Sequence, residues 1–248
     1  MGAGFMTKAD FRVMVLSDLH IPFHDRRALE LFKTVAKATK ASHCVCIGDF
    51  VDLYSLNRFG LSAQREADLE KELARGRKEL KAVREIFDVF KFLEGNHERR
   101  YTRYVDESAI KLGKVIPTIR EQLGVHAHEW VEYQKYCKFG KMHFVHDLGY
   151  SGQNALRQSL AAFGGSITIG HTHRGSVEYS GNVRGERHVG LNVGWLGDSR
   201  YIDYSNEARM RGWQLGWGVV DVAKDQTVFA QFVPVVKNRC CIDGVVYG

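Results

Sequence analysis

The sequence predicts an α/β protein, and two observations support this fold class. Short runs rich in β-branched and aromatic residues recur along the chain, and the early runs alternate with stretches of helical periodicity. The later runs follow one another without such helices, which favours an added, partly antiparallel sheet. The expected strands are residues 11–16, 43–48, 89–95, 141–146, 165–170, 188–194, 216–222 and 227–233.

Two amphipathic helices are expected in the first half of the chain. Residues 26–40 place apolar side chains on one face, and residues 62–87 repeat them at alternating steps of four and three. Both patterns are typical of helices that pack on a core and expose a charged face. A further helix is expected to begin at Pro117, because proline is favoured in the first turn. The apolar faces comprise Leu29, Phe32, Val35 and Ala36 in one helix, and Leu69, Leu73, Gly76, Leu80, Val83 and Phe87 in the other.

The composition is that of a globular chain. Its 248 residues are 44% hydrophobic and 26% charged, and no repeat, low-complexity tract or linker divides them. We therefore expect a single domain over residues 1–248, with a helical insertion at about 98–136 between two strands. No stretch approaches the ~20 apolar residues of a membrane span. The first residues show no long apolar region with a small-residue cleavage site, so secretion is not expected. The five cysteines lack zinc-site spacing, which favours inert thiols in a reduced, cytoplasmic compartment.

The charge balance is mildly basic. The chain has 35 Lys and Arg against 29 Asp and Glu, a formal net charge of +6. This excess favours polyanionic partners without identifying one. The local basic cluster is Arg99, Arg100 and Arg103, directly after the sequence Gly-Asn-His-Glu.

Acidic, amide and imidazole side chains follow five of the expected strands, where each strand ends. Each motif alone also fits a turn or a satisfied core histidine. Ligands of open α/β sheets bind at the carboxyl ends of the strands, so the motifs together predict one metal site there. In chain order the motifs supply Asp18 and His20, Asp49 and Asp52, Asn96 with His97 and Glu98, His146, and finally His171 and His173.

The types of side chain indicate which ions would bind. Carboxylates, imidazoles and one amide oxygen suit manganese, iron, zinc, nickel or cobalt better than calcium or magnesium. The set is too large for one ion and is about what two ions sharing a carboxylate require. Two-metal sites with ions ~3.5–4 Å apart serve the hydrolysis of phosphate esters.

In this order the motifs resemble those of the calcineurin-like metallophosphoesterases: D-x-H, G-D-x-x-D, G-N-H-[DE], H and G-H-x-H. The resemblance spans residues 18–173, and the motifs look most like those of compact, single-domain members found in bacteria and phages. It implies a four-layer α/β/β/α sandwich of two mixed sheets flanked by helices. Leu53 stands where the Ser/Thr protein phosphatases carry arginine, which disfavours that branch. Asp147 stands where the family often has a glycine after the fourth-motif histidine. Its carboxylate could either add a contact beside His146 or alter access to the site.

The resemblance also implies a role for each position. Asp49 would bridge two ions, and His97 would contact the phosphate and protonate the leaving oxygen. Asp52 and Glu98 would orient the ligands and His97, and Asn192 matches a late loop of the family only weakly. The first ion would be held by Asp18, His20 and His173, and the second by Asn96, His146 and His171.

The expected activity is a two-metal phosphodiesterase or nuclease-like enzyme, with a metal-bridging hydroxide as nucleophile and His97 as general acid. Manganese is the first choice of ion. Arg99, Arg100 and His24 are the expected substrate contacts. The alternative is a phosphomonoesterase acting on a nucleotide or other small molecule, and a non-catalytic metal-binding scaffold is a third class.

Three features stay open at this point. The aromatic residues of the insertion could stack on nucleic-acid bases or fill a small core of their own. The aromatic segment 201–218 could line the site or a dimer contact. The tail from residue 238 could pair with another subunit or form a strand within its own chain, so the oligomeric state is not predicted.

Overall fold

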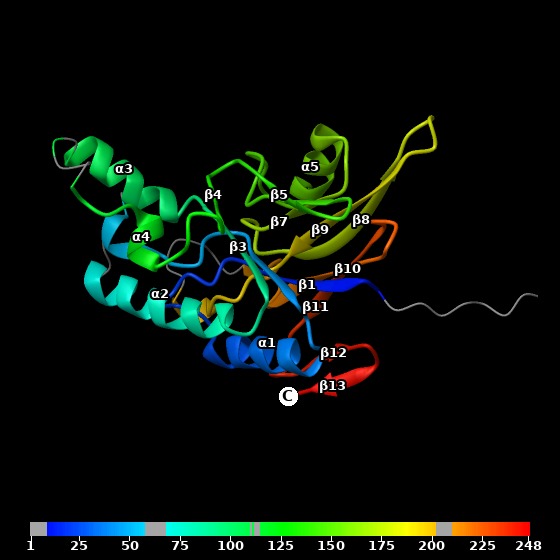
Figure 1. Cartoon of the computed structure of the whole chain (residues 1–248), viewed down its shortest axis with the longest axis horizontal. Helices are drawn as coiled ribbons and strands as arrows, with labels where there is room; N and C mark the ends of the chain where they lie inside the picture. Colours follow the sequence, from blue (N-terminus) through cyan, green and yellow to red (C-terminus); the bar gives the residue numbers. More distant parts are fainter. Residues whose placement is uncertain (1–8, 58–67, 110, 112–114, 202–209) are drawn as a thin grey trace, which may run out of the picture.

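Two large sheets pack face to face in the computed structural model, which describes all residues except 1–8, 58–67, 110, 112–114 and 202–209. Helices α1 (Arg26–Ala38) and α2 (Leu69–Arg84) cover the outer face of one sheet, and α5 (Ala155–Phe163) covers the outer face of the other (Figure 1). The four-layer α/β/β/α sandwich expected from the sequence is thereby confirmed.

The first sheet has six strands in the order β11-β10-β1-β2-β3-β4. Strands β1 to β4 run parallel, while β10 and β11 are antiparallel to their neighbours. The carboxyl ends of the parallel strands therefore gather at one edge. The strand bounds are β1 (Phe11–Leu16), β2 (His43–Cys46), β3 (Val89–Leu93), β4 (Trp130–Val131), β10 (Gly216–Val222) and β11 (Val228–Pro234).

The second sheet has five strands in the order β5-β6-β7-β9-β8. Its inner strands β6, β7 and β9 are parallel, and β5 and β8 are antiparallel edge strands. Both sheets thus have parallel central strands, and the residues that follow the carboxyl ends of these strands can form a site. The strand bounds are β5 (Cys137–Phe139), β6 (Met142–Phe144), β7 (Ile167–Ile169), β8 (Gly175–Gly181) and β9 (Arg187–Val193).

Strand β1 shows how alternation of side chains divides the core. Val13 and Val15 face the second sheet, whereas Met14 and Leu16 face the helices. Three apolar clusters result: one between the helices and the first sheet, one between the two sheets, and one between the second sheet and α5. Helix α1 begins where the Asp25 carboxylate accepts hydrogen bonds from two backbone N–H groups of its first turn, and its predicted apolar face is buried.

Several element bounds differ from the sequence predictions. Helix α2 begins at Leu69 and ends at Arg84, and residues 62–67 of the predicted helix lie outside the described residues. The helix expected from Pro117 begins at Ile119, because Thr118 and Glu121 form a capping box there. Helix α5 and strands β5 and β8 were not predicted.

The segment 98–136 contains more than the helices and loop that the sequence indicated. Its helices are α3 (Glu98–Ser108) and α4 (Ile119–Leu123), and it also contributes β4 to the first sheet. Tyr101 is buried and donates to the Pro117 carbonyl, and Trp130 stacks on Phe92. These contacts are those of packing residues.

The C-terminal segment pairs with itself. Strands β12 (Cys240–Ile242) and β13 (Val245–Tyr247) form a separate two-stranded sheet beside α1 (Figure 1). Arg12 forms ion pairs with Asp221 of β10 and Asp243 of the hairpin. Within the described residues, no helix combines the length and apolar character needed to cross a membrane.

Candidate metal centre

The seven predicted metal ligands converge where the carboxyl ends of the two sheets meet. Those of the first sheet follow β1, β2 and β3, and those of the second follow β6 and β7. Two groups of side chains result, each with ligand atoms within 4.8 Å of one another. The first group is Asp18, His20 and His173, and the second is Asp49, His146 and His171.

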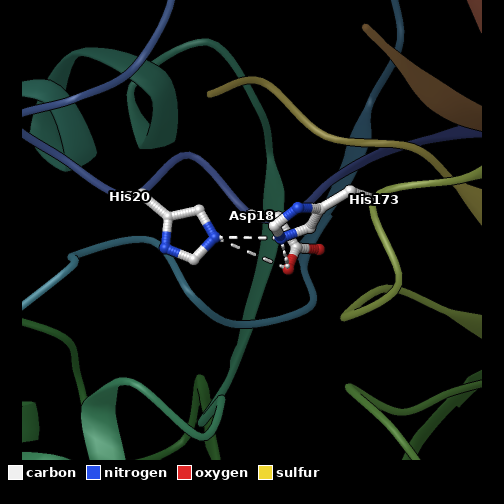
Figure 2. Close-up of side chains that lie close together, drawn as sticks. All are labelled: Asp18, His20 and His173. Atoms are coloured by element: carbon white, nitrogen blue, oxygen red, sulfur yellow. Dashed lines mark hydrogen bonds and ion pairs between the residues drawn. The ribbon is translucent and has the colours of Figure 1, made fainter. Parts of the chain in front are cut away.

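Figure 2 shows the first group, in which both imidazoles approach the Asp18 carboxylate. The Nε2 atoms of His20 and His173 lie 3.2 Å apart. Asp18 Oδ1 lies 3.3 Å from His173 Nε2 and 3.8 Å from His20 Nε2. Asp18 is fully buried, and this oxygen has no hydrogen-bond partner among the described residues. A buried carboxylate oxygen without a donor is costly, so its position beside two imidazole nitrogens fits a bound cation.

The second group is joined by the amide oxygen of Asn96. That oxygen lies 3.0 Å from His146 Nε2 and 2.8 Å from His171 Nδ1. Asp49 Oδ2 lies 3.4 Å from His146 Nε2. The Nδ1–H of His146 donates to the Ile47 carbonyl at 2.7 Å, which leaves Nε2 as the ligand atom.

The electrostatics around His146 favour positive charge. Burial lowers the pKa of His146, but the charges of Asp49, Asp18 and Asp147 outweigh it and raise this pKa to about 10. Protonation of His146 is one way to compensate these carboxylates, and a divalent ion is another. Carboxylate, imidazole and amide ligands of this kind suit divalent transition ions. The side chains therefore fit the ions that the sequence predicts.

Asp52 lies beside the ring nitrogen of His20 that faces away from the other ligands of the first group. Its Oδ2 lies 3.3 Å from His20 Nδ1, the ring nitrogen opposite to the one that faces His173. Carboxylates commonly orient metal-binding imidazoles through this second nitrogen. Burial raises the pKa of Asp52, but His20, His97 and Arg100 outweigh it and lower this pKa to about 2.

His97 lines a cavity beside the two groups of predicted ligands and is held by two contacts. Its Nδ1–H donates to the Asp52 carbonyl at 2.8 Å, because a carbonyl can only accept. Its Nε2 accepts from Arg100 at 3.0 Å, because a guanidinium can only donate. Burial lowers the pKa of His97 to about 4. The imidazole is therefore neutral here, with Nε2 facing the Arg100 guanidinium.

Glu98 ties two motif loops together through backbone groups. Its side chain is fully buried and accepts from the backbone N–H groups of Asp49, Phe50, Val51 and Gly95 at 2.9–3.1 Å. Burial and the charge of Asp49 raise the pKa of Glu98 to about 7. The contacts fix the loop after β2 against the loop after β3.

A second buried glutamate supports the continuation of the β2 loop. Glu72 of α2 accepts from the backbone N–H groups of Tyr54 and Ser55 at 2.8 and 3.0 Å, in the 3₁₀ turn Tyr54–Leu56. Burial raises the pKa of Glu72 to about 7.

The backbone of the site is unusual in two ways. Asp18, His20, Asp49, His171 and His173 all have φ between 50 and 65°, a conformation that is uncommon for residues with a side chain and gathers at functional sites. A Cβ atom at Gly95 would lie 2.3 Å from both Asp49 N and Asp49 Oδ1. Glycine at that position lets the two loops approach closely.

The predicted substrate contacts are placed differently from one another. Arg100 lines the cavity, which has a volume of about 770 Å³. Arg99 is exposed and lies 6.0 Å from the ring centre of Tyr133, and His24 is buried with its backbone bridged to Gly197. Neither is among the residues that line the cavity. Asn192 is buried and donates to Thr172, between the two histidines of the last motif.

Two open points of the sequence receive a structural answer. The Asp147 carboxylate accepts from the Tyr133 hydroxyl at 3.0 Å, so it connects the residue after His146 to the 98–136 segment. Trp213, from the aromatic segment 201–218, lines the cavity, as does Arg174. The sequence left open that segment 201–218 lines the site without singling out Trp213, and it did not indicate Arg174. The only signal for Arg174 is its position next to His173.

The fold and the site define a class of α/β/β/α sandwich proteins with a candidate metal centre rich in histidine and aspartate. The chain belongs to the calcineurin-like phosphoesterase family, whose sequence model matches residues 11–195. Membership supports hydrolysis of phosphate esters with divalent metals. The predicted family is thereby confirmed.

The comparisons also include whole-chain relatives. The Gene 54 proteins of Mycobacterium phages L5 and D29 are each 27% identical over 259 residues, which cover 95% of this chain and 98% of theirs. A crystal structure of Chaetomium thermophilum Vps29 superposes with a TM-score of 0.50 at 14% identity, over 92% of this chain and 87% of that one. The last comparison supports the fold alone.

Proposed function

We propose that this protein is a two-metal phosphodiesterase of nuclease-like type. The observation that carries the proposal is the convergence of seven ligand side chains, including the unpartnered Asp18 Oδ1, beside a cavity lined by His97 and Arg100. These seven side chains come from the ends of five strands in two sheets, which a merely structural polar cluster would not require.

The two groups of side chains would hold one ion each. Asp18, His20 and His173 would bind the first, and Asn96, His146 and His171 the second, with Asp49 bridging them. Manganese is the first choice, because carboxylate, amide and imidazole ligands are combined. When bound, such ions lower the pKa of a water molecule and neutralise charge on phosphoryl oxygens.

His97 and Arg100 would act on the substrate. Arg100 presents a fixed positive charge to a phosphoryl oxygen. His97 would protonate the leaving oxygen from Nε2, and an anionic phosphate in the cavity would favour the charged imidazole that this step requires. Asp52 would keep His20 and His97 oriented, and Glu98 would hold the loop that carries Asp49.

The charges around the cavity suit an anionic substrate. Among the residues that the structure describes, its lining includes two arginines, Arg100 and Arg174, and one carboxylate, which belongs to the predicted ligand Asp49. A polyanion with more than one phosphate suits this lining. A phosphomonoesterase remains the alternative to be separated by experiment. The cytoplasmic location inferred from the cysteines stays a prediction.

The experiment compares bis-p-nitrophenyl phosphate with p-nitrophenyl phosphate, using protein reconstituted with Mn²⁺. We expect turnover of the diester by the wild type, loss of both turnover and bound metal in Asp49→Ala, and slow turnover with metal retained in His97→Ala. Turnover of the monoester alone would replace the proposal by the alternative. Bound metal without turnover of either ester would support the scaffold class.

A further inference from the structure

We propose that Trp213 and Arg174 form a subsite beside the metal centre that binds an unpaired nucleobase and its neighbouring phosphate. The substrate class would then be single-stranded nucleic acid, an inference that rests on the proposed phosphodiesterase function. Both residues line the cavity that His97, Asp49 and Asn96 also line.

Trp213 is held against the centre by two other rings. His173 and Trp195 are stacked, with an interplanar angle of 12° and ring centres 4.9 Å apart. Trp213 stands at 80° to His173 and 68° to Trp195, with centre separations of 4.3 and 5.0 Å. Because the three separations are similar, Trp213 lies alongside the stacked pair rather than beyond either ring. Its position relative to the predicted ligand His173 is therefore fixed.

Exposure distinguishes the two tryptophans. Trp195 is 4% exposed and is part of the core, whereas Trp213 is half-buried and contributes to the cavity wall. An aromatic wall next to a phosphoryl-transfer centre is suited to stacking on the base of a nucleotide. Such stacking is sequence-tolerant and is a common basis of single-strand binding. A paired base would have to leave its duplex before it could stack in this way.

Arg174 provides the charge for a neighbouring phosphate. It directly follows the predicted ligand His173, and its guanidinium donates to the Gly212 carbonyl at 3.2 Å, on the loop that carries Trp213. Within the part of the chain that the structure describes, no carboxylate lies at ion-pair distance from Arg174. A half-buried guanidinium with remaining donors suits a phosphate oxygen.

The positions of the groups match the parts of a nucleic-acid strand. The scissile phosphate would lie at the metal centre near Arg100, the adjacent base against Trp213, and the next phosphate near Arg174. The cavity of about 770 Å³ falls within the size range of sites that enclose small ligands. A small aliphatic phosphoester would use neither Trp213 nor Arg174.

The first test is equilibrium binding in EDTA, which does not depend on turnover. Fluorescence anisotropy would compare a labelled oligothymidylate with an oligomer of the same length whose residues are abasic. We expect Trp213→Ala to weaken binding of the oligothymidylate about 5- to 150-fold, the range of one stacked base. Binding of the abasic oligomer should change less than about twofold, and Trp213→Phe should retain most of the affinity.

Two further variants separate stacking from charge and from general effects. Arg174→Gln should weaken binding of both oligomers by a similar factor, because it removes a phosphate contact. Tyr179→Ala removes an exposed aromatic side chain of β8, outside the cavity lining, and should leave both affinities unchanged. The thermal midpoint of each variant would show whether it is folded.

The outcomes distinguish the subsite from the proposed function. Equal weakening of both oligomers by Trp213→Ala, or no binding of oligothymidylate by the wild type, would overturn the subsite. Base-dependent binding together with no hydrolysis of any diester by the manganese-loaded wild type would support the subsite and overturn the phosphodiesterase proposal. Diester hydrolysis without base-dependent binding would do the reverse.

Discussion

Replacement of Glu98 by glutamine tests how the metal centre is held together. The carboxylate accepts four backbone N–H groups, with Phe50 and Val51 on Oε1 and Asp49 and Gly95 on Oε2. Glutamine keeps the shape of the side chain but replaces one of the two oxygens by a donor NH₂ group. Two backbone donors then face another donor.

The cost can be estimated from the lost contacts. Each buried N–H group left without an acceptor costs about 1–3 kcal/mol, so two of them give about 2–6 kcal/mol. In either orientation of the amide, at least one lost contact belongs to residues 49–51, the loop that carries the predicted bridging ligand Asp49. We therefore expect Glu98→Gln to lower both the free energy of unfolding and the affinity for Mn²⁺.

Urea denaturation, followed by circular dichroism on metal-free protein, measures the first effect, and isothermal titration with Mn²⁺ measures the second. Glu85→Gln is the matched control, because that side chain is exposed and pairs only weakly with Lys81. Stability of Glu98→Gln within about 0.5 kcal/mol of the control would refute the reasoning, since no buried donor could then have lost its acceptor.

Three further predictions concern other contacts of the site. Gly95→Ala should destabilise the fold by about 1–3 kcal/mol, because its Cβ would overlap Asp49, and a lowered urea midpoint would show this. The raised pKa of Glu72 means that its protonated form is favoured in the folded state. The stabilisation that protonated Glu72 provides is therefore complete below about pH 4.5 and is lost as the pH rises through about 7. Between pH 5 and 8, the free energy of unfolding of the wild type should therefore fall by about 1–3 kcal/mol more than that of Glu72→Gln. Equal decreases in urea titrations would contradict this. Tyr133→Phe should cost about 1–3 kcal/mol by removing the hydroxyl donor of buried Asp147, and unfolding curves that match the wild type would speak against that contact.

The ligand set could be predicted because its signal is local. Each of the seven predicted ligands follows the end of an apolar strand by two to four residues, as Asp18 follows β1 and Asp49 follows β2. The parallel order of the strands then brings distant motifs to one edge. The assignment of each side chain to a particular ion stays a prediction.

The elements that were missed lack such a signal. Strand β8 is an edge strand with no buried side chain, so its sequence has no apolar alternation. Helix α5 has no side-chain hydrogen bond at its N-cap, and β4 is only two residues long. Trp213 reaches the site through the loop between β9 and β10, a proximity that depends on tertiary packing.

The number of metal ions bound per chain shows directly whether this centre holds two ions. Protein loaded with Mn²⁺ and freed of excess ions by gel filtration would be analysed by inductively coupled plasma mass spectrometry, alongside Asp49→Ala and the exposed-site control Tyr179→Ala. We expect two ions per chain in the wild type and the control, and a clear loss in Asp49→Ala. One ion or none in the wild type, or two ions in Asp49→Ala, would contradict a centre of two ions bridged by Asp49.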